Sequence, residues 1–240
     1  MSKAKFSCNE KINFAYCDEN ANVRISNILA MAQQISEDHC DFLGMGYGYF
    51  KEKGKAFLLA KLRLNIARLP RGGELIKINT HAFLPNRAIY TRITDFCDEN
   101  GEVIASLDSR WTLVDIDSHK ICRRLPEDIP LPFDDAEDFK DFRSIRNTNP
   151  QHIFDVEVRP HQLDVNSHVN NTVYADMVFD VAYKVLPQNY DVKEFQIYYH
   201  NEARLGDVIT IGYEIIDNTL YVEGKIGEKS CFEAVMLIEI

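Results

Sequence analysis

The chain repeats itself once, and this repeat constrains the fold more than any other feature of the sequence. Residues 18–23 read D-E-N-A-N-V and residues 164–169 read D-V-N-S-H-V, so both fit D-x-N-x-[N/H]-V. Further along, residues 65–69 read N-I-A-R-L and residues 201–205 read N-E-A-R-L. Two matches in the same order indicate that the chain consists of two similar units.

Each D-x-N motif leads into apolar residues at helical spacing. Spacings of three and four in the first copy, and of four in the second, place these side chains on one face of a helix. The positions in the first copy are Ile25, Ile28, Leu29, Ala32 and Ile35. Those in the second copy are Val173, Met177, Val181 and Val185. Short polar residues precede both runs and are good N-caps, so we predict one long helix in each half.

Strand-like runs follow each predicted helix and are separated by turns that contain Gly. After the second match they are residues 74–80, 88–96 and 103–115 in the first half, and 207–213, 220–226 and 231–240 in the second half. This pattern predicts the α+β class, with two long helices each wrapped by an antiparallel sheet. Pairing the two sheets edge to edge would remove an exposed edge from each.

The stretch between the halves is rich in Pro and Asp, which is typical of a connector. We therefore expect a first unit at residues 1–130, a linker at 131–150 and a second unit at 151–240. We also expect a short helical turn around Asp135–Phe142.

Charge and motifs exclude several classes of function. The net charge of −10 argues against a nucleic-acid partner, which needs a basic surface. No run approaches the roughly 20 apolar residues of a membrane span, and the start M-S-K-A-K-F-S-C-N-E lacks the apolar run of a signal peptide, so we predict a cytoplasmic protein. The six cysteines form no C-x-x-C pair, and no G-x-S-x-G, Walker or H-E-x-x-H motif occurs. We expect neither a metal nor a cofactor.

A comparison of the two copies separates scaffold from site. Glu202 stands where the first copy has Ile66. Because side chains alternate along a strand, the apolar row Leu62, Leu64 and Ile66 corresponds to Tyr198, His200 and Glu202. We expect Glu202 to be partly desolvated on the core-facing side, which favours proton transfer. The alternative is a solvated glutamate at the end of a strand.

His168 is the second polar residue found in one copy alone, since its counterpart is Asn22. It lies just before the predicted helix, whose N-terminus could polarise a bound carbonyl group. The alternative is a cap or a surface histidine. Asp164 and Asn166 also occur in the first copy, as Asp18 and Asn20, so they either shape the turn or take part in chemistry, and the two roles can coexist.

These residues resemble a known family. The run R-P-H-Q-L-D-V-N-S-H-V-N-N-T-V-Y, Arg159 to Tyr174, is similar to the signature of the acyl-acyl-carrier-protein thioesterases of plants and bacteria. Ser109 to Pro126 resembles the end of that family's first hotdog repeat, and Tyr198 to Ala203 resembles its later catalytic strand. The resemblance implies a tandem hotdog fold. It also matches Asp164, Asn166, His168 and Glu202 to the catalytic residues of the family.

The resemblance implies hydrolysis of fatty acyl thioesters held on acyl carrier protein. Glu202 would act as general base on a water or as nucleophile, His168 would protonate the leaving thiolate, and the first unit would supply walls for the acyl chain. Plant members commonly have Cys where this chain has Ala203, so a cysteine nucleophile is absent at this position. The alternatives are an acyl-CoA thioesterase of the same fold and a non-catalytic protein that senses acyl-CoA.

An acidic carrier protein requires a local basic patch on an enzyme of net charge −10. The candidate residues are Arg63, Arg68, Arg71, Lys77, Arg123 and Arg124. A homodimer is compatible with the sequence.

Overall fold

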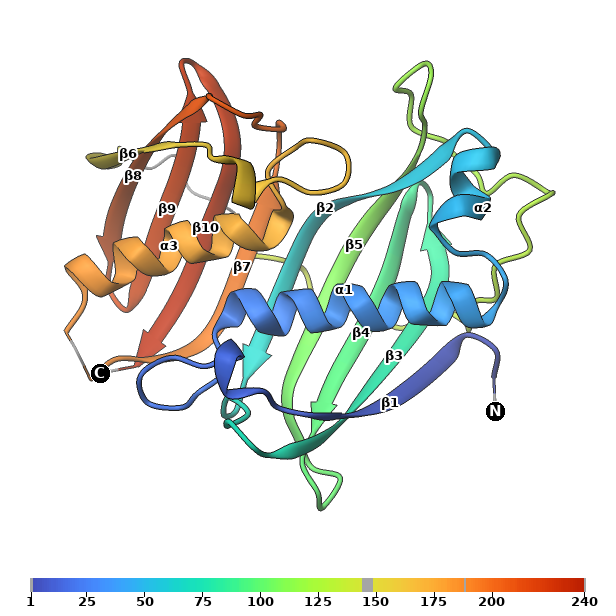
Figure 1. Cartoon of the computed structure of the whole chain (residues 1–240), viewed down its shortest axis with the longest axis horizontal. Coiled ribbons are helices and arrows are strands. Elements are labelled where there is room, and N and C mark those ends of the chain that lie inside the picture. Colours follow the sequence, from blue (N-terminus) through green and yellow to red (C-terminus); the bar gives the residue numbers. More distant parts are fainter. Residues whose placement is uncertain (1, 144–148, 188, 240) are drawn as a thin grey trace. The chain divides into compact units, whose positions relative to one another are not determined.

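The chain forms two compact units in a computed structural model that describes residues 2–143, 149–187 and 189–239 (Figure 1). Unit 1 comprises Met1–Leu62 and Ala67–Lys140, and unit 2 comprises Arg63–Ile66 and Asp141–Ile240. The change from one unit to the other between residues 140 and 141 falls inside the stretch 131–150, for which the sequence predicts a linker.

Unit 1 is one antiparallel sheet with a long helix across one face (Figure 1). Its elements are β1 (Lys5–Lys11), the 3-10 helix η1 (Phe14–Tyr16), α1 (Ile25–Phe42), α2 (Tyr47–Glu52), β2 (Lys55–Ile66), β3 (Leu75–Asn86), β4 (Ile89–Cys97) and β5 (Val103–Asp115). We describe β2 with unit 1, where it begins, although its end, Arg63–Ile66, is grouped with unit 2. The strand order is β1-β3-β4-β5-β2. In the register, Lys5 pairs with His81, Thr80 with Thr94, and Thr94 with Leu107.

Unit 2 has the same elements in the same order, apart from α2. They are β6 (Gln151–Glu157), η2 (Pro160–Gln162), α3 (Asn171–Val185), β7 (Asp191–Tyr199), β8 (Val208–Ile216), β9 (Thr219–Ile226) and β10 (Lys229–Glu239). The strand order is β6-β8-β9-β10-β7, which matches that of unit 1 strand for strand. The predicted α+β class and the structural repeat are confirmed.

The two helices bury their apolar faces as amphipathic helices do. All five positions predicted for α1 are buried. In α3 the buried residues are Tyr174, Ala175, Met177, Val178, Val181 and Ala182, whereas Val173 and Val185 are only half-buried. The prediction for α3 is wrong at its ends because a spacing of four exceeds the 3.6 residues of a turn, so such a series drifts around the helix. The caps also differ, because Arg24 makes no capping bond while Asn170 Oδ1 accepts from Thr172 N at 3.0 Å.

The connector is held against unit 1 over much of its length. Leu84 N donates to Asp134 O at 2.8 Å, and the ring of Phe139 lies 5.0 Å from that of Phe83. Residues 135–142 contain no helical turn, so that prediction is wrong: the one backbone hydrogen bond found inside this described segment runs from Phe139 N to Glu137 O at 3.0 Å, which is not a helical spacing. Residues 144–148, also predicted as linker, lie outside the described residues.

Candidate active site

Asp164 shapes the turn that carries His168. Its Oδ1 accepts from the backbone N–H groups of Asn166 at 2.8 Å and of His168 at 3.2 Å, and its own N–H donates to His168 O at 2.7 Å. Ser167 has a φ of 64°, in the left-handed region, which closes the turn. This is an Asx-type turn that presents the His168 side chain immediately before α3.

Unit 1 contains the same turn. Asp18 Oδ1 accepts from Asn20 N and from Asn22 N, both at 2.9 Å, and Ala21 has a φ of 61°. Because the turn forms equally well without a histidine, the backbone contacts of Asp164 are structural. They fix the place of His168 whether or not Asp164 also takes part in chemistry.

Glu202 lies outside the strand that the sequence predicts for it. β7 ends at Tyr199, and the side chain of Glu202 is 52% exposed. The amides of His200 and Asn201 both reach Cys231 O, at 2.8 and 3.4 Å, and β10 has a bulge at the same point. A bulge bends a strand and breaks its alternation, so Glu202 turns away from the core. The prediction of a desolvated, core-facing Glu202 is therefore wrong, and the alternative of an exposed glutamate after the strand describes it better.

The corresponding strand of unit 1 runs further. There the amides that share one acceptor are those of Ala67 and Arg68, which both reach Ile104 O at 3.0 and 3.1 Å. Because Ala67 aligns with Ala203, the two amides that share one acceptor lie three residues further along the repeat in unit 1 than in unit 2. Ile66 consequently stays inside β2, where it is 8% exposed.

His168 and Glu202 come together in unit 2. His168 Nε2 lies 3.0 Å from Glu202 Oε2, and the histidine side chain is 22% exposed. The two segments are also joined through the backbone, because Val169 N donates to Ala203 O at 2.9 Å. This pair of an imidazole and a carboxylate, partly open to solvent, can hold and pass a proton.

Unit 1 has no such pair at the repeated positions. Asn22 Oδ1 accepts from Arg71 Nε at 3.4 Å, and the position of the glutamate is taken by buried Ile66. The same turn thus carries a side chain that lacks acid–base chemistry.

Asn166 lies in the turn beside Asp164, and the helix start contributes less than the sequence suggests. Asn166 is exposed, and its Nδ2 lies 3.5 Å from Asp164 Oδ2. The N–H of Thr172, in the first turn of α3, is already taken by Asn170 Oδ1. That N–H is therefore not free to stabilise an oxyanion.

Comparison with known proteins identifies the family. Residues 3–132 match the Acyl-ACP thioesterase N-terminal domain, and residues 145–231 match the Acyl-ACP thioesterase C-terminal domain. The chain belongs to the acyl-ACP thioesterase family.

Curated relatives and solved structures extend this finding. The chain is 21% identical to the chloroplastic palmitoyl-acyl carrier protein thioesterase of Gossypium hirsutum, over 94% of this chain and 59% of that protein. It spans about six-tenths of the length of that relative. An acyl-ACP thioesterase from Bacteroides thetaiotaomicron superposes with a TM-score of 0.90 at 18% identity, covering 100% of both chains. The 12:0-ACP thioesterase from Umbellularia californica gives 0.84 at 15% identity, covering 98% and 97%. The tandem hotdog fold is thereby confirmed.

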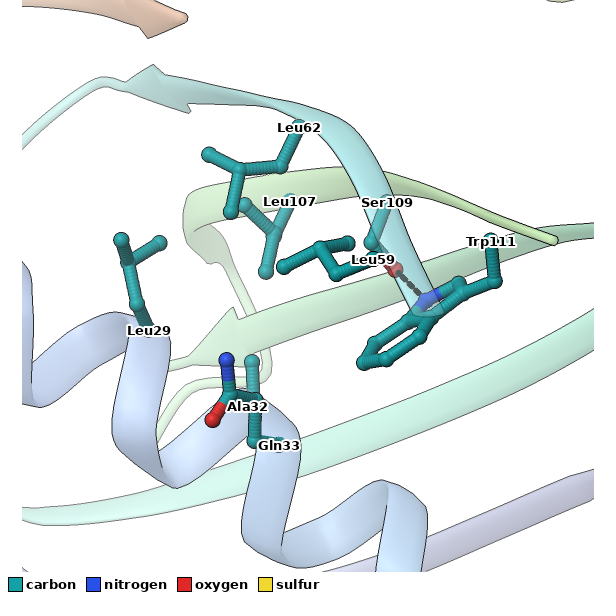
Figure 2. A pocket seen from close by; sticks show the side chains of 8 residues that line it. All are labelled: Leu29, Ala32, Gln33, Leu59, Leu62, Leu107, Ser109 and Trp111. Atoms are coloured by element: carbon teal, nitrogen blue, oxygen red, sulfur yellow. Dashed lines mark hydrogen bonds between the residues drawn. The ribbon is translucent and has the colours of Figure 1, made fainter. Parts of the chain in front are cut away.

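A narrow apolar cavity lies in unit 1 of this family member (Figure 2). α1 contributes Leu29, Ala32 and Gln33, and the strands β2 and β5 contribute Leu59, Leu62, Leu107, Ser109 and Trp111. Figure 2 shows the indole of Trp111 at one side, where its Nε1 donates to Ser109 Oγ at 2.9 Å. The cavity volume of about 10 Å³ suits one water molecule, so an acyl chain needs these side chains to move.

Two of the arginines predicted for a basic patch are engaged elsewhere. Arg63 is 7% exposed, and its Nη1 donates to Asp141 O at 2.9 Å. Arg68 pairs with Glu74 at 2.6 Å and lies 3.8 Å from Asp98. Burial withdraws Arg63 from a partner, so the predicted patch is wrong for Arg63. The Arg68 side chain stays 44% exposed beside these two carboxylates, so its place in a patch remains a prediction.

Among the described residues, no group of three or more His, Cys, Asp or Glu side chains is placed to hold a metal ion. No helix in the described ranges is both long enough and apolar enough to cross a membrane.

Proposed function

We propose that this chain hydrolyses fatty acyl thioesters of acyl carrier protein and releases the free fatty acid. The observation that carries the proposal is the 3.0 Å contact between His168 Nε2 and Glu202 Oε2, in the unit that matches the C-terminal domain of the family. Relatives named palmitoyl- and oleoyl-acyl carrier protein thioesterases support this substrate class.

Glu202 is the proposed general base. One oxygen faces His168, and no other hydrogen bond of this carboxylate is found within the described part of the chain, so Oε1 is open to a water. A carboxylate placed in this way can take a proton from the water as its oxygen attacks the thioester carbonyl carbon. Asn166, which is exposed in the same turn as His168, would orient that water or bind the oxyanion.

His168 is the proposed proton donor to the leaving group. When the tetrahedral intermediate collapses, the C–S bond breaks and the thiolate needs a proton. Glu202 then holds the proton from water, and His168 Nε2 lies 3.0 Å away. His168 gives its Nε2 proton to the sulfur and recovers a proton at Nε2 from Glu202, which yields the acid and the thiol and returns both side chains to their starting forms.

Unit 1 takes the non-catalytic part in this proposal. Its apolar cavity under α1 would supply the walls for the acyl chain after the leucine side chains move apart. Asn22 and Ile66 support the idea that it contributes no second acid–base pair.

A matched substrate panel tests the proposal. The same acyl chains, from short to long, are presented on acyl carrier protein and on coenzyme A, and kcat/KM is measured for each. We expect the carrier-bound series to give the higher values. A higher value on coenzyme A would replace the carrier assignment with an acyl-CoA thioesterase. The absence of hydrolysis on both would leave a non-catalytic acyl-binding protein.

Variants at the repeated position test whether there is one site. His168→Ala removes the proton donor, so turnover should fall by at least ~10²-fold. Asn22→Ala, at the same place in unit 1, should leave most of the turnover. Equal losses in the two variants would contradict the proposal of a single site in unit 2.

A further inference from the structure

The sheet of unit 1 carries polar side chains at positions that are apolar in unit 2. The two copies align at the turns before β4 and β9, where Arg87 and Asp217 have positive φ angles of 57° and 53°. With this alignment and the strand register, four pairs of positions differ in polarity. They are Tyr90 and Leu220, Arg92 and Val222, Ser109 and Ala234, and Thr80 and Ile211. Because all four residues of unit 2 are buried, the fold itself does not need polar groups at these positions.

The polar positions adjoin the apolar cavity of unit 1. Ser109 lines the cavity, and Arg92 is its direct partner across the antiparallel pair of β4 and β5. Directly paired residues point to the same face of a sheet, so Arg92 lies on the cavity side of β4. Figure 2 shows Ser109 and Trp111 at one side of the cavity and Leu29 at the other. An apolar chain that passes the leucines therefore approaches the polar positions.

Arg92 is a partly buried cation without a carboxylate. Its Nη1 donates to His39 Nδ1 and to Thr80 Oγ1, each at 3.1 Å, and both acceptors are uncharged. Within the ranges that the structure describes, no carboxylate pairs with Arg92, and its Nε and Nη2 make no hydrogen bond. Burial lowers the pKa of Arg92, but a guanidinium stays charged at neutral pH. Nε and Nη2 together form the fork that binds a carboxylate through two parallel hydrogen bonds.

Tyr90 supplies a second unpaired donor. It is 4% exposed, and its hydroxyl oxygen is buried without a hydrogen-bond partner in the described part of the chain. Tyr90 precedes Arg92 by two residues in β4, so both side chains lie on the same face of the sheet. Burial raises the pKa of the Tyr90 hydroxyl, which therefore keeps its proton and remains a donor. Buried polar groups are normally hydrogen-bonded, so these unpaired donors indicate an acceptor that the chain itself does not supply.

We propose that Arg92 and Tyr90 bind a carboxylate at the far end of the acyl chain, so that the preferred substrates are thioesters of acyl groups with a second carboxyl group. The inference rests on the proposed function, in which the cavity of unit 1 receives the acyl chain. The leucines of the cavity contact the methylene groups, and the guanidinium binds the terminal anion. A free phosphate ion lacks the apolar part that such a path requires.

Matched acyl groups test the inference. Acyl carrier protein is loaded with chains of one length that end in a methyl group, in a carboxylate or in the methyl ester of that carboxylate, and kcat/KM is measured for each. In the wild type the carboxylate-ended chain should exceed the other two by at least about tenfold, because only it forms the charge-assisted contact. Equal or lower values for the carboxylate-ended chain at every length would overturn the inference.

Arg92→Gln removes the charge and should abolish this preference. Arg92→Lys keeps the charge but not the fork, so it should fold and keep only part of the preference. Arg87→Gln is the matched control, because Arg87 is an exposed cation of the same hairpin and both Gln variants change the net charge from −10 to −11. The control should keep the wild-type preference. Equal losses on all three chain ends in Arg92→Gln would show a purely structural role and overturn the inference.

Tyr90→Phe removes a hydroxyl that makes no hydrogen bond within the chain, so the variant should be at least as stable as the wild type. Its kcat/KM for the carboxylate-ended chain should fall about threefold, while the value for the methyl-ended chain should not fall. An unchanged preference in a folded Tyr90→Phe would overturn the role of Tyr90.

Binding without turnover separates the inference from the proposed function. The monoamide of a dicarboxylic acid has one carboxylate and the diamide has none, and calorimetric titration gives the Kd of each. We expect the monoamide to bind the wild type and Arg87→Gln at least about tenfold more tightly than the diamide, and Arg92→Gln to bind both equally. Equal affinities in the wild type would overturn the inference even if the protein hydrolyses acyl thioesters. An inactive wild type with the expected affinities would defeat the proposed function alone.

Discussion

At the scale of single residues, Glu202 is the side chain on which the proposed chemistry depends most. Glu202→Gln keeps the shape and still accepts a hydrogen bond from His168 Nε2, but it cannot take a proton from water. Turnover should fall by at least ~10²-fold with little change in substrate binding, and the residual rate should lose its acidic limb. Steady-state kinetics across pH, with folding checked by circular dichroism, measure this outcome.

Ala203→Cys provides the contrast to that variant. It introduces the thiol that the resemblance to the plant members of the family implies at this position. Ala203 is 0% exposed, so a thiol there would be buried, and we expect no gain in activity.

Near-wild-type turnover of a folded Glu202→Gln would remove the carboxylate from the mechanism and leave His168 as the base.

We predict that His39 makes the stability of unit 1 depend on pH. It is 1% exposed, with Nε2 2.9 Å from Lys3 O and Nδ1 3.1 Å from Arg92 Nη1. An arginine can only donate, so Nδ1 accepts and the proton lies on Nε2. Burial lowers the pKa of His39, and the charge of Arg92 lowers it further against the opposing bond to Lys3 O.

The sign of this effect follows from proton linkage. In the unfolded chain the histidine titrates near its ordinary value of about 6.5, while the folded protein resists protonation until a lower pH. The stabilising contribution is therefore complete above about pH 6.5 and declines as the pH falls below it. In urea unfolding at pH 7.5 and at pH 5.5, His39→Gln should lose less free energy on acidification than the wild type does. An identical loss in both proteins would show that His39 does not contribute.

At the scale of elements, features that depend on residues close together in the sequence are predicted well. Features that depend on pairing between distant segments are not. The face of α1 and the hairpin around Asp98–Gly101 depend on neighbouring residues, and both are found as predicted. β1 and β6 were not predicted. Each is a short edge strand without a fully buried side chain, so hydrophobic alternation gives no signal.

The position of Glu202 shows why part of the site could not be predicted. Sequence comparison finds the residue, because Ile66 is apolar and Glu202 is not. Its exposure depends on Cys231, which lies on another strand and accepts both the His200 and the Asn201 amides. Register and bulges arise from pairing between strands, so the sequence of one strand does not reveal them.

At the scale of the whole molecule, the net charge of −10 opposes an acidic carrier unless a local basic surface compensates. Arg204 and Arg159 are exposed near the site, and neither side chain has a carboxylate partner among the residues that the structure describes. Their segments are joined because Val158 N donates to Asp207 O at 2.9 Å. Arg204 occupies the repeat position of Arg68, which is neutralised by Glu74 in unit 1.

We therefore predict that salt weakens the reaction with acyl carrier protein. If Arg159 and Arg204 attract the carrier, kcat/KM should fall as salt rises, because screening acts on the local attraction. Reversing both charges, in Arg159→Glu with Arg204→Glu, should lower kcat/KM about tenfold at low salt and make added salt favourable. Lys3→Glu with Lys11→Glu is the control: both lysines are exposed in unit 1, and each double variant changes the net charge from −10 to −14. If the control loses as much kcat/KM as the arginine variant, net charge alone governs the encounter and the local basic surface has no part in it.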